Sequence, residues 1–258
     1  AARLGPAAIQ VTRLASWAQV ALPAELRDRL RALIARARHG RTVFDDWSQA
    51  LQLATERGLS ALFHGPHGTG KTLAAGLVAR ELDRALYRVA LAPLLAMTPG
   101  EAEHPLGALF DAAEDGSLIL LFDDAEALLA GPVAAAVRQR LDTFEGIAIF
   151  TAQHDRAIDP AFRRQLAMRM AFPLPDEPLR AKLWASHIPS QLRAGGLDVA
   201  ALARQFALSG GDIRDSVLRA AFLAAQDGVA LTQSHLERAV RLEHDAPGEL
   251  ADDDRRTT

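Results

Sequence analysis

One eight-residue segment constrains this chain more than any other feature of its sequence. Residues 65–72 read Gly-Pro-His-Gly-Thr-Gly-Lys-Thr, and they lie between an apolar run (59–63) and a stretch with helical spacing (71–83). A glycine-rich turn at such a junction presents backbone N–H groups to phosphate, and the helix that follows directs its positive end at the same point. The pattern is that of a Walker A loop, whereas the alternative is a glycine-rich turn without a ligand. It predicts a nucleotide-binding site.

The cationic residues of the chain support this interpretation. Of 29 Lys and Arg residues only two are lysines, Lys71 and Lys182. A compact ammonium fits between two phosphates where a broad guanidinium does not fit as well. We therefore expect ATP as the ligand, with Lys71 at the β- and γ-phosphates and Thr72 on Mg²⁺. The residues expected to contact the nucleotide, among which His67 has no assigned chemistry, are Gly65, Pro66, His67, Gly68, Thr69, Gly70, Lys71, Thr72 and Leu73.

An acidic motif follows the second continuous apolar run. Residues 118–122 (LILLF) lead directly into Asp123 and Asp124. A phosphate-binding loop requires a carboxylate at the end of a neighbouring buried strand to hold the water shell of Mg²⁺. We expect Asp123 to serve the metal and Asp124 to polarise the attacking water, while Glu126 points away along the next helix. The alternative is that these acids only cap that helix.

Apolar runs alternate with helical stretches over the first two thirds of the chain. One of these helices is expected at 104–114, where Pro105 can start it. This alternation predicts an α/β fold in which helices cover both faces of a parallel sheet. Beyond a turn-rich joint at 173–178 only helical patterns follow, which predicts a small all-helical lid domain. The expected strands are 59–63, 86–91, 118–122, 147–151 and 168–172. The expected division is an N-terminal helical segment (1–57, with helices at 24–39 and 46–57), an ATPase core (58–174), a lid (175–246) and a disordered tail (247–258).

Composition excludes several classes of protein. The chain has 258 residues, 49% hydrophobic and with a net charge of −3, which argues against intrinsic disorder and against a nucleic-acid coat. No apolar run approaches the roughly 20 residues that span a bilayer, and no signal peptide is recognisable. The absence of Cys excludes disulfides and thiolate zinc sites. We expect a cytoplasmic protein with neither a membrane nor a nucleic acid as partner.

Together, several segments resemble the AAA+ ATPases, and most of all the Cdc48-like AAA ATPases encoded with bacterial contractile injection systems. The resemblance covers nearly the whole chain. It implies an enzyme that hydrolyses ATP with Mg²⁺, forms a ring, expected to be a hexamer, and assembles or remodels a protein client. The segments that carry it are SWAQVALP (16–23), SALFHGPHGTGKTLAA (60–75), LFDDAEALL (121–129), TFEGIAIFTAQHDRAIDPAF (143–162) and SGGDIRDSVLRAAFLAA (209–225).

The resemblance also implies roles for residues outside the phosphate loop. Gln153 ends a strand where the family has its sensor 1 residue, which contacts the γ-phosphate or the water. Arg164 follows a DPAF segment and resembles the arginine finger, which acts on the nucleotide of the neighbouring subunit. Arg163 and Arg169 are alternatives, and for each of the three a surface salt bridge is the competing interpretation.

Two further features resemble the family less specifically. Arg214 lies at the start of a helix in the expected lid, where the sensor 2 arginine stands, although a solvated arginine is an equal alternative. The stretch from Trp17 to Val20 resembles the segment that packs near adenine, and its alternative is a Trp that anchors a helix.

Three departures from the family pattern bear on activity. Asp124 replaces the usual Glu, and a displacement of a water-orienting group by about 1 Å can cost on the order of a hundredfold in rate. Thr98 stands where a pore aromatic grips threaded polypeptide, with Met97 beside it. Gln153 replaces the usual Asn, and Ala167 replaces the second finger arginine.

We therefore expect intact binding but weakened hydrolysis and threading. Two other functions stay open. One is a nucleotide-dependent scaffold with negligible turnover. The other is a DNA-directed AAA+ loader, for which a basic face would come from Arg27, Arg29, Arg31, Arg36, Arg38 and Arg41.

Overall fold

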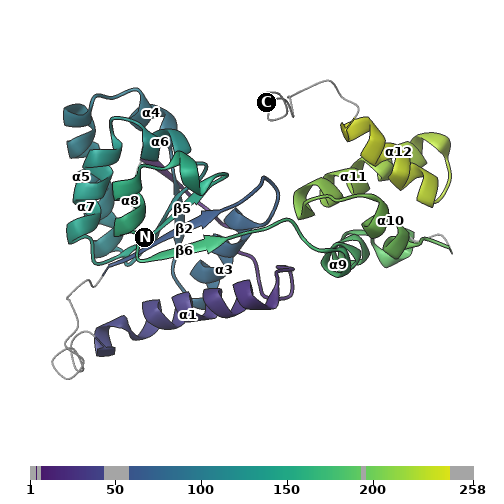
Figure 1. Cartoon of the computed structure of the whole chain (residues 1–258), viewed down its shortest axis with the longest axis horizontal. Coiled ribbons are helices and arrows are strands. Elements are labelled where there is room, and N and C mark those ends of the chain that lie inside the picture. The colour runs from purple at the N-terminus through teal and green to yellow at the C-terminus, as the bar shows by residue number, and fades with distance from the viewer. Residues whose placement is uncertain (1–3, 5–6, 44–57, 193–195, 245–258) are drawn as a thin grey trace, which may run out of the picture. The chain divides into compact units, whose positions relative to one another are not determined.

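The computed structural model describes residues 4, 7–43, 58–192 and 196–244, and the helix expected at 46–57 lies outside them (Figure 1). The chain divides into two compact units, Ala1–Pro175 and Asp176–Thr258. The first unit carries the sheet and the phosphate loop, and the described part of the second is helical.

A six-stranded sheet forms the centre of the first unit (Figure 1). Its order is β1-β3-β4-β5-β2-β6, and all neighbouring strands are parallel except the pair of β1 and β3. Parallel neighbours need crossover connections, which are helical here and cover the sheet. The predicted α/β class is therefore confirmed. The strands are β1 (Ala8–Gln10), β2 (Leu59–His64), β3 (Leu86–Val89), β4 (Ile119–Phe122), β5 (Ile147–Ala152) and β6 (Met168–Ala171).

Two hydrophobic cores lie on opposite faces of this sheet. Strand residues alternate between them: Leu120 and Phe122 belong to the first core, Ile119 and Leu121 to the second. The helices of the first core cover one face and those of the second core cover the other (Figure 1). The first core is covered by α4 (Leu91–Leu95), α5 (Pro99–Asp115), α6 (Glu126–Ala130), α7 (Ala134–Thr143) and α8 (Pro160–Gln165), the second by α1 (Ala24–Arg41) and α3 (Lys71–Glu81).

Helix α5 begins at Pro99, whereas the sequence pattern placed its start at 104 with Pro105 as the initiating residue. The earlier start comes from Thr98, whose backbone N and Oγ1 both donate to the Glu101 carboxylate at 2.8 Å. These hydrogen bonds lower the pKa of Glu101. Thr98, expected in a pore loop, is therefore the N-cap of a helix, and Pro105 lies inside that helix.

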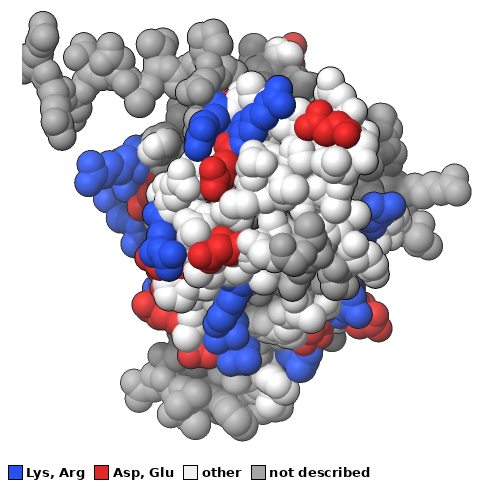
Figure 2. Space-filling view, turned by 90° about the vertical axis from the view of Figure 1, so that its right-hand side faces the viewer, with Lys and Arg blue, Asp and Glu red and all other residues white. Residues whose placement is uncertain are grey.

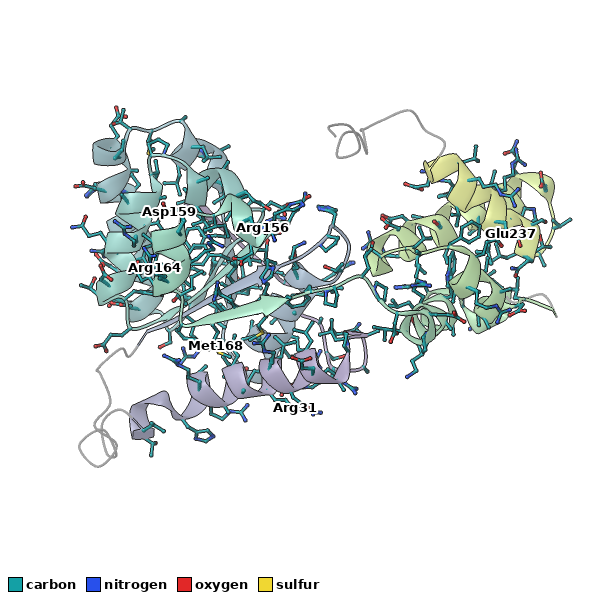
Figure 3. All side chains as sticks on the ribbon, viewed as in Figure 1. Arg31, Arg156, Asp159, Arg164, Met168 and Glu237 are labelled. Atoms are coloured by element: carbon teal, nitrogen blue, oxygen red, sulfur yellow. The ribbon has the colours of Figure 1, made fainter. Side chains whose placement is uncertain are left out.

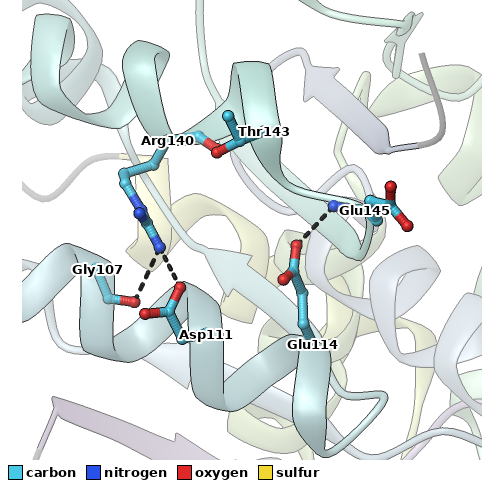
Figure 4. A network of polar contacts seen from close by, with 6 residues as sticks. All are labelled: Gly107, Asp111, Glu114, Arg140, Thr143 and Glu145. Carbon is cyan, nitrogen blue, oxygen red and sulfur yellow. Dashed lines mark hydrogen bonds and ion pairs between the residues drawn. The ribbon is translucent and has the colours of Figure 1, made fainter. Parts of the chain in front are cut away.

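Polar contacts join helices α5 and α7 on the outer side of the first core (Figure 4). The Arg140 guanidinium donates to the Gly107 carbonyl at 3.3 Å and forms an ion pair with Asp111. Past the end of α7, the Glu145 backbone N donates to Glu114 at 2.6 Å. These contacts join α5 to α7 and to the segment that precedes β5.

The second unit contains α9 (Glu177–His187), α10 (Val199–Gln205), α11 (Gly210–Asp227) and α12 (Gln233–His244). Side-chain caps start three of these helices, from Asp176, Asp198 and Ser209. Trp184 is fully buried among the helices. The predicted helical C-terminal part is therefore confirmed.

Charged and uncharged residues share the surface. In the view of Figure 2, Lys and Arg are interspersed with Asp and Glu among uncharged residues. Among the residues that the structure describes, no helix is long and apolar enough to cross a membrane.

Candidate nucleotide-binding site

The phosphate loop connects β2 to α3 and depends on glycines at three positions. Gly65, Gly68 and Gly70 have φ angles of 148°, 72° and 97°, which side chains other than glycine rarely adopt. A Cβ on Gly65 would lie 2.0 Å from the carbonyl oxygen of Phe172, just past β6. The loop is therefore held against β6 at its first glycine.

Lys71, the first residue of α3, lies inside this loop. Its side chain is buried, and Nζ donates to the carbonyls of Gly65 at 2.6 Å and Pro66 at 2.9 Å. Burial lowers the pKa of the ammonium, while nearby carboxylates, with Asp124 first and Glu126 second, oppose this shift. The loop carbonyls hold the single cation of the loop next to its backbone N–H groups.

Thr72 comes from α3 and Asp123 from the end of β4, and their side chains are in contact. The Thr72 hydroxyl donates to Asp123 Oδ1 at 2.9 Å. The same carboxylate oxygen accepts the hydroxyl of Thr151 at 2.7 Å, and the backbone N of Asp124 donates to Thr151 Oγ1 at 2.8 Å. Sequence reasoning brought Thr72 and Asp123 to one site but missed Thr151.

Asp124 and Glu126 also lie near the loop lysine, as their effect on its pKa indicates. Asp124 is exposed and has a left-handed backbone, with φ 51°. Glu126 was expected to point away, and that expectation is wrong: its carboxylate accepts a hydrogen bond from the backbone N of Gln153. Glu126 lies in the first turn of α6, from which side chains point back toward the preceding segment. It thereby joins the ends of β4 and β5.

The remaining residues of the predicted contact set lie at or near the loop. Gln153 follows β5 directly and is exposed, as are His67 and Thr72. Leu73 is 51% exposed although it lies in the first turn of α3. Thr69 is buried, and its hydroxyl donates to the Pro66 carbonyl at 2.8 Å, so its side chain shapes the loop from within.

Helix α8 carries the predicted arginine finger (Figure 3). Asp159 caps it by accepting from the backbone N of Ala161 and Phe162. Arg163 and Arg169 both lie 3.7 Å from Asp155, so the salt-bridge alternative applies to these two. Arg164 is exposed and makes no ion pair or hydrogen bond within the described residues.

Arg214 and Trp17 have partners that favour the alternatives to a nucleotide contact, namely a surface arginine and a Trp that anchors a helix. Arg214, in the second unit, forms an ion pair with Asp215 at 2.9 Å, and this contact raises its pKa. The guanidinium of Arg31 lies 5.3 Å from the ring centre of Trp17, which fits a Trp that anchors helix α1.

The donor set of this site fits Mg²⁺ bound together with a nucleotide. Mg²⁺ usually takes one or two protein oxygens and completes its shell with phosphates and water. Thr72 and Asp123 supply such oxygens. In the described part of the chain no group of three His, Cys, Asp or Glu residues forms a metal site of protein ligands alone.

A glycine loop between a buried strand and a helix, with a lysine inside it and an acid at the end of β4, which β5 separates from β2 in the sheet, defines the class of P-loop nucleotide-binding proteins. Comparison with known families agrees. Residues 61–174 match the model of the ATPase family associated with various cellular activities (AAA). This segment is therefore similar to AAA ATPase domains.

Curated relatives support the same assignment. The chain is 27% identical to a 26S proteasome regulatory subunit homolog of Methanothermobacter thermautotrophicus over 201 residues, which are 70% of this chain and 54% of that protein. A homolog from Methanocaldococcus jannaschii is 28% identical over 203 residues, with the same coverage. Protein CdcH of Halobacterium salinarum is 29% identical over 153 residues, 53% of this chain and 21% of that protein. The chain spans about half the length of the first two relatives.

Proposed function

We propose that this chain binds Mg²⁺–ATP at residues 65–73, hydrolyses it slowly, and works as a ring that assembles or remodels a protein complex. One observation carries the proposal. The Thr72 hydroxyl and the Asp123 carboxylate are hydrogen-bonded at 2.9 Å beside a buried lysine held in the loop. In P-loop ATPases these three groups bind the metal and the β- and γ-phosphates.

Residues of this chain account for each part of such a reaction. Backbone N–H groups of the loop and the Lys71 ammonium would bind the phosphates, and Thr72 and Asp123 would hold Mg²⁺, which would neutralise their developing charge. Asp124, whose charge acts on the Lys71 ammonium, would orient the attacking water. Gln153 would contact the γ-phosphate or that water.

The ring arrangement in this proposal rests on Arg164. An exposed arginine without a partner in the described residues is available to a second subunit, whereas Arg163 and Arg169 are held by Asp155. We propose a hexamer in which Arg164 reaches the nucleotide of its neighbour. Arg214 is retained as the proposed sensor 2 on the sequence resemblance alone, because its ion pair with Asp215 favours the solvated alternative.

The proposed client is a protein. The names of two relatives refer to a proteasome regulatory subunit, which supports a protein partner. The sequence resemblance to Cdc48-like ATPases of contractile injection systems favours a role in assembling such a particle in the cytoplasm.

A scaffold whose nucleotide state controls assembly is the second candidate function. Two observations favour it: Asp124 has a shorter side chain than the family's Glu, and Thr98 is fixed as a helix cap by Glu101 instead of standing in a gripping loop. The DNA-directed loader is disfavoured, because the net charge of the chain is −3 and Arg31 of the expected basic face is paired with Asp28.

One experiment separates these functions. The whole chain is sized by light scattering with and without Mg²⁺–ATP while phosphate release is measured. Assembly with turnover supports the proposed function, and assembly without turnover supports the scaffold. A chain that neither assembles nor releases phosphate contradicts both. Duplex binding that weakens steeply with salt would support the loader instead.

A further inference from the structure

Thr151 is a buried polar residue that neither the family resemblance nor the sequence pattern assigned to the site. It is the only polar residue of β5, whose other five residues are Ile147–Phe150 and Ala152, and its side chain is fully buried. A buried hydroxyl is costly unless its hydrogen bonds are made. Thr151 makes them to both acidic residues at the end of β4.

The direction of these hydrogen bonds follows from their chemistry. The backbone N of Asp124 can only donate, so Thr151 Oγ1 accepts that bond, at 2.8 Å. The single hydroxyl proton of Thr151 is then directed at Asp123 Oδ1, at 2.7 Å. Because Thr72 also donates to Asp123 Oδ1, one carboxylate oxygen accepts two hydroxyl protons. The other oxygen, Oδ2, has no hydrogen-bond partner in the described residues.

We propose that Thr151 is a positioning residue that prepares both acids for Mg²⁺–ATP. Its hydroxyl fixes the Asp123 carboxylate so that Oδ2 remains available to the metal and its water shell. It also anchors the backbone N of Asp124, whose left-handed conformation (φ 51°) directs the second carboxylate. This inference rests on the proposed binding of Mg²⁺–ATP.

Residues that orient a metal ligand through a hydrogen bond typically change metal affinity or activity by about 10–100-fold when removed. The structure offers a matched pair of substitutions. Thr151→Val keeps the branched shape but removes the hydroxyl, and Thr151→Ser keeps the hydroxyl. Thr151→Ala removes the hydroxyl without adding a methyl group, and it replaces Thr151→Val if that variant does not fold.

The test measures the affinity of a fluorescent ATP analogue, first in EDTA and then with Mg²⁺. We expect the gain in affinity from Mg²⁺ to fall by about 10–100-fold in Thr151→Val and to persist in Thr151→Ser, with the affinity in EDTA unchanged. A full Mg²⁺ gain in Thr151→Val, even in a less stable protein, overturns the inference because the role is then structural. Absence of analogue binding by the natural chain contradicts the proposed function itself.

Discussion

Replacement of Gly65 by Ala tests how the phosphate loop is held against the sheet. A Cβ at this position would lie 2.0 Å from the Phe172 carbonyl oxygen and 2.9 Å from its carbon, and both are backbone atoms. Neither can move freely, because the Phe172 backbone N donates to the His64 carbonyl at 2.7 Å. Overpacking costs about 1–3 kcal/mol, and an unfavourable backbone conformation adds about 1–3 kcal/mol. We expect the free energy of unfolding of the first unit to fall by about 2–6 kcal/mol.

Two other glycines separate these contributions. Gly70 has a φ of 97° but open space around its Cβ, so Gly70→Ala carries only the backbone cost of about 1–3 kcal/mol. Gly100 has open space and lies in the first turn of α5, so Gly100→Ala is expected to stabilise by about 0.4–1 kcal/mol.

The assay is urea unfolding followed by circular dichroism, with deuterium exchange of the β5 peptide to assign the transition to the first unit. The expected order of stability is Gly100→Ala, then Gly70→Ala, then Gly65→Ala. Equal losses for Gly65→Ala and Gly70→Ala would refute the argument that contact with Phe172 requires the first glycine.

Three further predictions concern the site. Asp124→Glu is expected to raise steady-state phosphate release by up to about a hundredfold, and unchanged turnover would show that the shorter acid does not limit the chemistry. Arg164→Ala should lower turnover by about a thousandfold while sparing ATP affinity, and mixing it with Asp124→Asn subunits should restore part of the activity; no restoration would exclude a role in the neighbouring subunit. Burial, followed by Arg169 and other nearby cations, lowers the pKa of His64 against the opposing charge of Asp155. The stability that neutral His64 contributes is therefore present above pH 6.5 and is lost as the pH falls through the lowered pKa of the folded state. His64→Gln should therefore flatten the decline in the free energy of unfolding toward about pH 5. An unchanged decline in this variant would contradict the argument.

Strands β4 and β5 could be predicted because both are continuous apolar runs, as expected for strands covered on both faces. Strands β3 and β6 contain Arg88 and Arg169, and they were predicted from the alternation of strands with helices. Strand β1 could not be predicted, because it has only three residues at the sheet edge and an exposed Ile9. The start of α5 was misplaced although the sequence carries a signal for it: Thr98 and Glu101 have the spacing of a capping box, and Pro99 stands at the first helical position. Local contacts of this kind decide helix boundaries.

The candidate site shows the same limit. The sequence places Lys71, Thr72 and Asp123 together because their spacing is that of a known motif. It does not distinguish Arg164 from Arg163, since only the folded chain places Asp155 beside the latter. Thr151 was missed because a β-branched residue in an apolar run is typical of any buried strand. Its position one residue before the end of β5, the strand that pairs with β4, is the only available signal.

Calorimetric titration of the whole chain with Mg²⁺–ATP tests the central claim most directly, with Lys71→Ala and Lys182→Ala compared side by side. Lys182 is exposed in the second unit and serves as the matched control for loss of a lysine. We expect saturable binding by the natural chain and by Lys182→Ala. Lys71→Ala should bind about 10–100-fold more weakly, because a charge-assisted hydrogen bond contributes about 1.5–3 kcal/mol. No binding by the natural chain, or equal affinity in Lys71→Ala, would contradict the assignment of residues 65–73 as an ATP site.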